Sequence, residues 1–458
     1  MTERVSALDA SLLYLDHPTT PMHVGSVLVF TPPEGGFEHA DLVALIRQRI
    51  AFAPRYRQRV KDVPLGLARP VWIDDIDFDI TYHVRRSALP KPGSTAQLNE
   101  LVGRLMSRPL DRRRPLWEMY LIEGLDDGRF ALVTKTHQAL VDGLASIDLV
   151  QVIMDASPDA QMTTSDRWQP RPEPSAVELM ASAVTESIVH PGVAIDAARS
   201  TMGQITGIAG SLGEKAAELA SSALSIAKPT SSTPLNVTVG EHRRVATGYF
   251  GFEEFRDLHR VLGSTVNDVM LTVLTGALRS WLMGRGVGVT GRSQLRAAVP
   301  FSTSDSGSPV SVFLIDLPIG EPDPLVRLRQ IGFETARLKD MAQLIGAESI
   351  ISVAGLAPPT LHALGARLAS NMSSRVFNLA VTNVPGPQRP YYLGGSRLIA
   401  SYPIMPLTRN QALSIGITSY DGGVFVAANA DHDALPDIDD LIGELRTALL
   451  ELREAAQP

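Results

Sequence analysis

The sequence predicts a mixed α/β (α+β) fold, built as two sheet-and-helix domains. The chain has 458 residues, more than one ordinary domain needs to bury a core. Strand-type runs alternate with helix-type patterns in both halves, which is typical of layered α/β or α+β domains. The middle is rich in Ser, Thr, Pro, Ala and Gly. We therefore place an N-terminal domain at 1–160, a linker and helical connection at 161–235, and a C-terminal domain at 236–458.

Composition excludes several functional classes. Apolar residues make up 44% of the chain and charged residues 20%, as in a globular protein. The net charge of −7 argues against a nucleic-acid partner. The chain has no cysteine, which excludes disulfides, thiolate metal sites and a cysteine nucleophile, and which fits a reducing compartment. The ten histidines include no HxH or HExxH spacing, so we expect no metal.

The amino terminus has no continuous apolar segment after its charges, so we expect no signal peptide. Nowhere do eighteen uncharged apolar residues follow one another, so we expect no membrane-spanning helix. Any contact with lipid is expected at the protein surface.

The N-terminal half contains clear strand and helix patterns. Its most informative feature is a predicted hairpin, in which strands at 117–123 and 130–136 flank the turn Asp126-Asp127-Gly128. The other elements expected here are a strand at 26–30, helices at 41–51 and 95–106, and an extended strand or strand pair at 72–84.

The C-terminal half repeats this alternation. Thr265 or Asn267 is expected to cap a helix at 269–283, and Asp421-Gly422-Gly423 predicts a hairpin between 413–419 and 424–430. The remaining expected elements are strands at 243–250, 295–299, 310–317 and 377–382, helices at 252–262, 325–341, 360–371 and 437–455, and two helices within 176–227.

His137 is the main candidate for chemistry. It follows a strand and precedes Asp142-Gly143, where apolar spacing predicts a helix. A histidine at such a strand end can be open to substrate, and its imidazole can accept and return a proton near neutral pH. The alternative is that His137 is structural and that Asp142 caps the helix or is held in an ion pair.

The segment His137-Gln138-Ala139-Leu140-Val141-Asp142-Gly143 resembles the HHxxxDG motif of the bacterial wax ester synthase/diacylglycerol acyltransferase family, within the CoA-dependent acyltransferase superfamily. Further stretches resemble this family in the same order: 8–12 with 18–25 its amino terminus, 109–111 with 114–118 its PLW motif, 265–269 its ND motif, and 382–387 another shared segment. The resemblance implies two chloramphenicol-acetyltransferase-like domains with a tunnel between them.

The resemblance also implies the reaction. Acyl-CoA would be a substrate rather than a cofactor, and the acceptor would be a lipid alcohol. Diacylglycerol would give triacylglycerol, and a long-chain alcohol would give a wax ester. With such substrates we expect a cytoplasmic protein associated peripherally with membranes or lipid inclusions. The sequence does not indicate an oligomeric state.

One position departs from the family motif. The second histidine, which the family is thought to use as general base, is replaced by Gln138, and an amide is not a usable base. In a regular strand His137 and Gln138 would point to opposite faces, but a strand end is free to leave this alternation. We therefore expect His137 to be the base and Gln138 to orient a substrate oxygen. Supporting roles at the site are expected for Asp142, Gly143, Asn267 and Asp268.

Two alternatives remain open. A degenerate family member would bind acyl-CoA, lipid or a partner protein with little catalysis, and Gln138 favours that hypothesis. A different acceptor, such as the amines or thioesters of condensation-domain relatives, is disfavoured because no carrier-protein or adenylation segment is found. Separately, the basic stretch at 55–61 is either a solvated face or a site for the phosphates of CoA.

Overall fold

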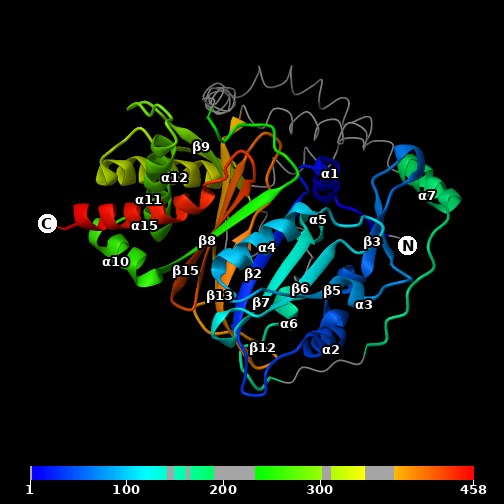
Figure 1. Ribbon diagram of the computed structural model, residues 1–458. Helices are drawn as coiled ribbons and strands as arrows, with labels where there is room; N and C mark the ends of the chain where they lie inside the picture. The colour runs from blue at the N-terminus through cyan, green and yellow to red at the C-terminus, as the bar shows by residue number, and fades with distance from the viewer. Residues whose placement is uncertain are drawn as a thin grey trace, which may run out of the picture.

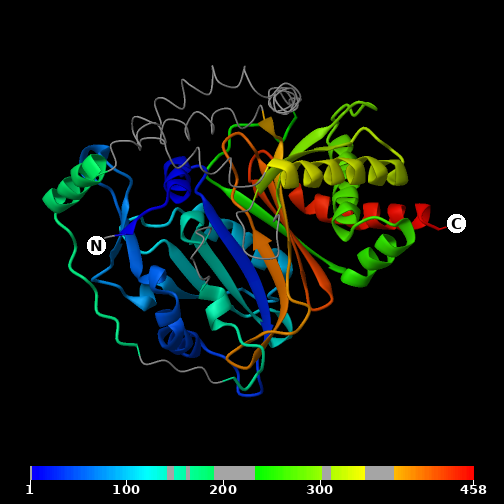
Figure 2. The ribbon, with the colours of Figure 1, turned by 180° about the vertical axis from the view of Figure 1, so that it is seen from behind.

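A computed structural model of the chain describes residues 3–141, 149–160, 166–189, 233–301, 311–345 and 376–457. Within these ranges it contains two six-stranded sheets and one three-stranded sheet, with helices packed against them (Figures 1 and 2). The predicted α/β class and the arrangement in two sheet-and-helix layers are confirmed.

The first large sheet carries His137, the first residue of the HQALVDG motif, at the end of its strand β7. Strand β7 pairs antiparallel with β2 and β6, and the register places His23 opposite His137 and Phe30 opposite Phe130. The predicted hairpin is confirmed by β6 and β7, with Asp127 in its turn at φ 55°. The order is β12-β13-β2-β7-β6-β5, with bounds β2 His23–Thr31, β5 Val84–Ala88, β6 Trp117–Glu123, β7 Phe130–His137, β12 Tyr392–Leu393 and β13 Ser396–Ile404.

The second large sheet belongs to the C-terminal half. Its predicted hairpin is confirmed by β14 and β15, where Asp421 and Gly422 have φ of 42° and 82°. The order is β10-β9-β11-β14-β15-β8, with bounds β8 Arg243–Gly251, β9 Leu295–Phe301, β10 Ser311–Leu317, β11 Leu379–Pro385, β14 Leu413–Tyr420 and β15 Gly423–Asp431.

The predicted division of the chain needs one correction. Strands β12 and β13 come from the C-terminal half, yet they extend the N-terminal sheet, because β13 pairs antiparallel with β2 from Arg397 opposite Thr31 to Ile404 opposite Gly25. The segment 236–458 therefore does not form a domain separate from the N-terminal sheet. The exchange of strands joins the two halves through backbone hydrogen bonds.

Helices cover both sheets, and most lie where periodicity predicts them. In the C-terminal half α11 packs against both α12 and α15 (Figure 1). The bounds are α1 Ala7–Leu15, α2 His39–Arg49, α3 Ile80–His83, α4 Thr95–Ser107, α5 Gln138–Val141, α6 Leu149–Ile153, α7 Ala176–Val189, α10 Phe252–Leu262, α11 Val266–Gly284, α12 Pro324–Ile345 and α15 Ile438–Ala455.

Residues 72–84 are not the predicted extended strand or strand pair. Strand β4 (Val71–Asp74) ends early, and Asp79 accepts a hydrogen bond from the Thr81 N–H at 2.9 Å, which caps α3. Strand β4 belongs instead to the small sheet β1-β4-β3, with β1 at Glu3–Arg4 and β3 at Gln58–Lys61. The predicted helix at 360–371 lies outside the described residues, as does the second predicted helix of 176–227.

Of the helices in the described ranges, none taken singly has the length and apolar composition of a membrane span. Helices α10 and α11, bent by 106° relative to each other, meet that criterion only as a pair.

A second contact between the two halves is made where α4 lies along β8. Gly103 of α4 faces the backbone of Arg243, and a Cβ atom at Gly103 would lie 2.7 Å from the Arg243 carbonyl oxygen. One turn later the Ser107 hydroxyl accepts a hydrogen bond from the Arg243 N–H at 2.9 Å. Only glycine therefore allows this approach of helix to strand.

We predict opposite effects of alanine at two helical glycines, Gly103 in this contact and Gly443 outside it. Gly103→Ala should lower the free energy of unfolding by about 1–3 kcal/mol, because the added methyl group meets backbone that cannot move aside. Gly443→Ala in α15 should raise it by about 0.5–1 kcal/mol, since a Cβ there meets nothing within 4 Å. Denaturant unfolding of both variants measures the difference, and equal effects would contradict this description of the interface.

Candidate active site

His137 is the last residue of β7 and is almost fully buried, with a relative exposure of 1%. Its backbone N–H donates to the Leu116 carbonyl at 2.9 Å. The His23 ring lies edge-on at a centroid distance of 6.1 Å. Burial and neighbours on both sides thus fix the position of the imidazole.

Both ring nitrogens of His137 face protein groups. Nδ1 accepts a hydrogen bond from the Ala139 N–H at 3.1 Å, so in the neutral ring the proton is on Nε2. Nε2 lies 3.7 Å from Oδ2 of Asp16, which is longer than a hydrogen bond, and the contact becomes an ion pair only when the ring is protonated. In this arrangement Asp16 orients the ring, and no lone pair of His137 points towards a substrate.

Asp16 begins the segment that connects α1 to β2, which we call the Asp16–Met22 loop. Its Oδ1 accepts from the Met22 N–H at 2.9 Å, and the Met22 carbonyl accepts from the Gln138 N–H at 2.9 Å. Burial raises the pKa of Asp16, but the His137 ring and the Met22 N–H stabilise the carboxylate more, so the pKa lies below its ordinary value. The loop therefore holds both residues at the start of the motif.

Gln138 is the first residue of α5 and is half-buried. Strand β7 ends at His137, so the strict alternation of side chains ends between these two residues. Among the described residues, no hydrogen bond to the Gln138 side-chain amide is found. Asp142 and Gly143, which the sequence assigns supporting roles, lie outside the described residues.

If His137 acts as a base, one hydrogen bond must first be broken, and the sequence does not reveal that bond. To take a proton from a substrate hydroxyl, Nδ1 must first give up the Ala139 N–H. The turn from β7 into α5 directs this N–H at the ring, and residue spacing gives no signal for it. The role of His137 as base stays a prediction.

Lys135 is a member of the site that sequence reasoning missed. It is fully buried two residues before His137, and its ammonium donates to the Leu105 carbonyl at 3.1 Å and to the Arg108 carbonyl at the end of α4. Burial lowers the pKa of Lys135 to about 8. Burial, with Lys135 nearby, also holds the pKa of His23 well below its ordinary value. His23 is therefore neutral near pH 7, while Lys135 ties α4 to the strand that carries His137.

The predicted ND residues lie at the start of α11. Thr265 caps the helix as predicted, because its hydroxyl accepts from the Asp268 N–H and Asp268 accepts from the Thr265 N–H, both at 3.1 Å. Asp268 is buried and also accepts from the Thr335 hydroxyl at 2.7 Å. Its contacts support the helix terminus.

Asn267 accepts from the Asn383 amide at 3.0 Å, so the fold joins two of the stretches that resemble the family. Within the described ranges, no hydrogen bond or ion pair links Asn267 or Asp268 to His137 or Gln138. Among the described residues, the structure thus places His137 beside Gln138 and Asn267 beside Asp268, without a direct contact between the two pairs.

Each cation of the basic stretch at 55–61 contacts a carboxylate. Arg57 pairs with Asp166, and Arg59 and Lys61 both contact Glu173 at 2.6 Å. Arg55 lies 2.5 Å from Glu3. These ion pairs favour the interpretation as a surface face over a site for the phosphates of CoA.

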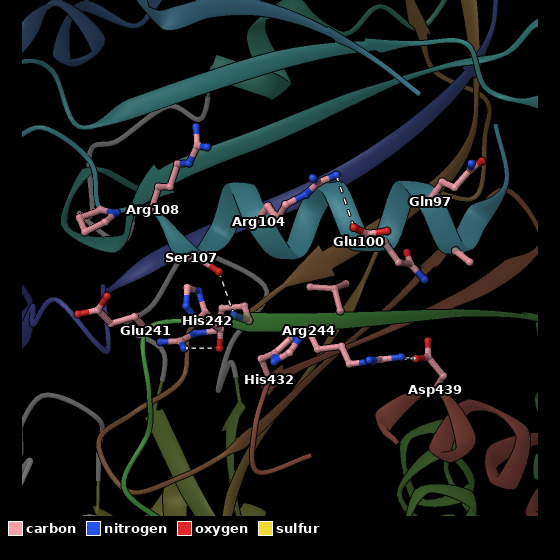
Figure 3. Close-up of a pocket in the computed structure, with 15 residues that line it drawn as sticks. Gln97, Glu100, Arg104, Ser107, Arg108, Glu241, His242, Arg244, His432 and Asp439 are labelled. Atoms are coloured by element: carbon pink, nitrogen blue, oxygen red, sulfur yellow. Dashed lines mark hydrogen bonds and ion pairs between the residues drawn. The ribbon is translucent and has the colours of Figure 1, made fainter. Parts of the chain in front are cut away.

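A groove of about 980 Å³ lies between α4 and β8 (Figure 3). On its β8 side Arg244 pairs with Asp439 at 2.7 Å, and on its α4 side Arg104 pairs with Glu100 at 3.7 Å. Pro109 is among the lining residues, and the N–H of the next residue, Leu110, donates to Nε2 of His23 at 3.4 Å. The groove therefore lies close in sequence to a contact of His23. In the described part of the chain, no group of three potential metal ligands is found.

Comparison with solved structures defines the class. The fold is similar to the wax ester synthase/diacylglycerol acyltransferase from Marinobacter aquaeolei VT8, with a TM-score of 0.73, 27% identity, and 99% of each chain covered. It is also similar to the starter condensation domain of rhizomide synthetase RzmA in complex with C8-CoA, at a TM-score of 0.55 and 15% identity. The chain thus has the two-domain fold of the CoA-dependent acyltransferase superfamily, as predicted.

Sequence comparison gives the family. Residues 5–270 match the wax ester synthase/diacylglycerol acyltransferase catalytic domain, and residues 306–453 match the WS/DGAT C-terminal domain. The probable diacylglycerol O-acyltransferase tgs3 of Mycobacterium tuberculosis is 45% identical over 56% of this chain and 95% of its own length. The probable diacylglycerol O-acyltransferase tgs2 of that organism is 32% identical over 98% of both chains. The chain belongs to the wax ester synthase/diacylglycerol acyltransferase family, and the predicted resemblance is confirmed.

Proposed function

We propose that the protein is an acyl-CoA-dependent O-acyltransferase that makes triacylglycerol from diacylglycerol, or wax esters from long-chain alcohols. The observation that carries this proposal is the match to both family domains along the chain, with the HQALVDG motif at the junction of β7 and α5. Acyl-CoA is one substrate, and a lipid alcohol is the other.

The reaction needs little covalent chemistry from the protein. The acceptor hydroxyl oxygen attacks the thioester carbonyl, its proton passes to a base, the carbon–sulfur bond breaks, and CoA leaves as a thiol after protonation. Orientation of two bound substrates can lower the barrier by about 7–11 kcal/mol. A general base raises the rate by about 10²–10⁴-fold, which corresponds to about 3–5 kcal/mol. Positioning is therefore the larger requirement, and the Asp16–Met22 loop supports it by fixing the motif residues His137 and Gln138.

For the proton transfer we retain His137 as the base, with Gln138 orienting a substrate oxygen. Gln138 suits that role because its amide both donates and accepts hydrogen bonds. The base role requires a small movement at the turn into α5 that frees Nδ1 from the Ala139 N–H. Asp16 would then stabilise the imidazolium that forms, because its carboxylate faces the opposite nitrogen.

The second candidate function is a degenerate family member that binds acyl-CoA or lipid without turnover. Gln138 at the position of the family's second histidine favours it, and so does the engagement of both His137 nitrogens. Turnover of labelled acyl-CoA with diacylglycerol, compared with a titration of acyl-CoA binding, separates the two. Labelled triacylglycerol and free CoA would support the acyltransferase, whereas tight binding without product would support the degenerate alternative.

Substitutions at His137 test whether the ring acts as a base. His137→Ala should lower kcat by about 10²-fold or more. His137→Asn should lower it as much, because an Asn oxygen can still accept the Ala139 N–H but cannot take a proton. Gln138→His restores the usual pair and should keep or raise kcat. Melting temperatures measured beside kcat serve as the control for folding.

The base assignment is contradicted if His137→Ala turns over substrate normally. It is also contradicted if His137→Asn recovers the activity that His137→Ala loses, since His137 would then act only as an acceptor that shapes the turn into α5.

We also propose that the protein binds lipid surfaces peripherally, because long acyl chains and diacylglycerol partition into membranes and lipid inclusions. One corner of the described surface favours such contact. Leu65 is 87% exposed at φ 59°, a conformation that leucine rarely adopts, and Leu67 is 47% exposed beside it. Helix α7 lies against this turn at the edge of the molecule and exposes Val177 (Figure 1).

The double variant Leu65→Ser/Leu67→Ser should reduce co-flotation with diacylglycerol-containing vesicles severalfold, because two apolar side chains would no longer enter the lipid. Val261→Ser in α10, which removes another exposed apolar side chain, is the matched control and should float normally. Equal flotation of both variants would place the contact elsewhere, and wild-type protein that stays soluble with lipid-loaded vesicles would contradict membrane association.

A further inference from the structure

Arg243, the first residue of β8, reaches from the C-terminal half to the loop that holds His137. Its side chain is buried, with a relative exposure of 5%. One guanidinium nitrogen, Nη1, donates to the Gly240 carbonyl at 2.8 Å and to the His242 carbonyl at 3.0 Å. The other, Nη2, donates to the Thr19 carbonyl, at the outer turn of the Asp16–Met22 loop.

The loop can transmit this contact because its turn is closed by its own hydrogen bonds. The Thr20 N–H donates to the His17 carbonyl at 2.9 Å, and the His17 N–H donates to the Thr20 carbonyl at 3.4 Å. The Thr19 N–H also donates to Nδ1 of His17 at 3.3 Å. A displacement at Thr19 therefore moves the turn as a unit, together with Asp16 and Met22 at its ends.

We propose that Arg243 is a positioning residue for the reaction, through which the C-terminal half fixes the Asp16–Met22 loop and hence the motif residues His137 and Gln138. The chain of contacts is Arg243 to the Thr19 carbonyl, the turn to Asp16 and Met22, Asp16 to the His137 ring, and Met22 to the Gln138 N–H. This inference rests on the proposed acyltransferase function. It holds whether or not His137 takes the proton, because the loop contacts both His137 and Gln138.

Burying the Arg243 guanidinium costs desolvation free energy. We take this cost as a sign that the hydrogen-bond geometry of the guanidinium serves the loop. Burial lowers the pKa of Arg243 to about 10, opposed by the carboxylate of Asp431. A buried charge is tolerated only when its hydrogen bonds are satisfied, and here three backbone carbonyls accept from it. A planar guanidinium holds such acceptors in a fixed relative geometry, which a hydrophobic side chain cannot do.

Arg244 provides a matched control. It is the next residue of the same strand, but it lines the groove and pairs with Asp439 in the C-terminal half (Figure 3). Its side chain is 41% exposed, so Arg244→Gln removes a guanidinium without disturbing the loop.

The test compares Arg243→Gln and Arg243→Lys with Arg244→Gln in the full-length chain. Hydrogen–deuterium exchange should be faster in Arg243→Gln at segments 16–23 and 136–141, since the Met22 and Gln138 N–H groups lose their fixed acceptors. In turnover of acyl-CoA with diacylglycerol, kcat should fall by about tenfold or more, with KM for acyl-CoA changed by less than about twofold. Arg243→Lys, which keeps the charge but not the fork of donors, should fall between Arg243→Gln and wild type, and Arg244→Gln should match wild type.

A double-mutant cycle with Asp16→Asn separates positioning from general destabilisation. If both residues act through the loop, Arg243→Gln should cost little further kcat in an Asp16→Asn background. Fully additive losses would overturn the proposal, as would wild-type exchange rates in both segments of Arg243→Gln. If Arg243→Gln fails to fold, the same measurements on Arg243→Lys decide the question.

The exchange readout does not depend on activity. If the wild-type protein turns over no substrate, the proposed function fails, while accelerated exchange in the Arg243 variants alone would still establish the link from β8 to the loop.

Discussion

The geometry of the motif depends on one carboxylate. Asp16 accepts the Met22 N–H with one oxygen and faces Nε2 of His137 with the other. Its pKa lies below the ordinary value in spite of burial, because the His137 ring and the Met22 N–H stabilise the charged form. The carboxylate therefore stays ionised at neutral pH and keeps the loop, the end of β7 and the start of α5 in one arrangement.

The site is also a product of both halves of the chain. Strand β13 joins the N-terminal sheet, α4 lies against β8 at Gly103, and Arg243 donates to the loop beside the motif. An acyltransferase of this class must orient two substrates, one of them a lipid. That orientation depends on how accurately the N-terminal and C-terminal halves are held relative to each other. Shared hydrogen bonds hold these halves together more closely than a flexible linker would.

Local patterns predicted most of the elements because local physics decides them. Periodicity and capping chemistry within a few residues are enough to predict strands β6 and β7, helices α4 and α10, and the Thr265 cap. Strand β13 escaped notice because Pro403 and a register shift between Leu398 and Ala400 interrupt its pattern, and its partner β2 is far away in sequence. The position of the motif was predictable from the sequence. The contacts that hold the His137 imidazole were not. The Asp16, Lys135 and Arg243 contacts join segments distant in sequence, and the Ala139 N–H is directed by the turn itself.

The protonation of His137 tests this account most directly. Nitrogen-15 NMR of the ¹⁵N-labelled protein, with His137 assigned among the ten histidines by comparison with His137→Asn, reports which ring nitrogen carries the proton. Because Nδ1 accepts the Ala139 N–H, the account predicts a neutral ring with an unprotonated Nδ1 and a protonated Nε2 facing Asp16. A neutral ring with its proton on Nδ1 would contradict it, since the Ala139 contact and the orientation by Asp16 would then both be lost.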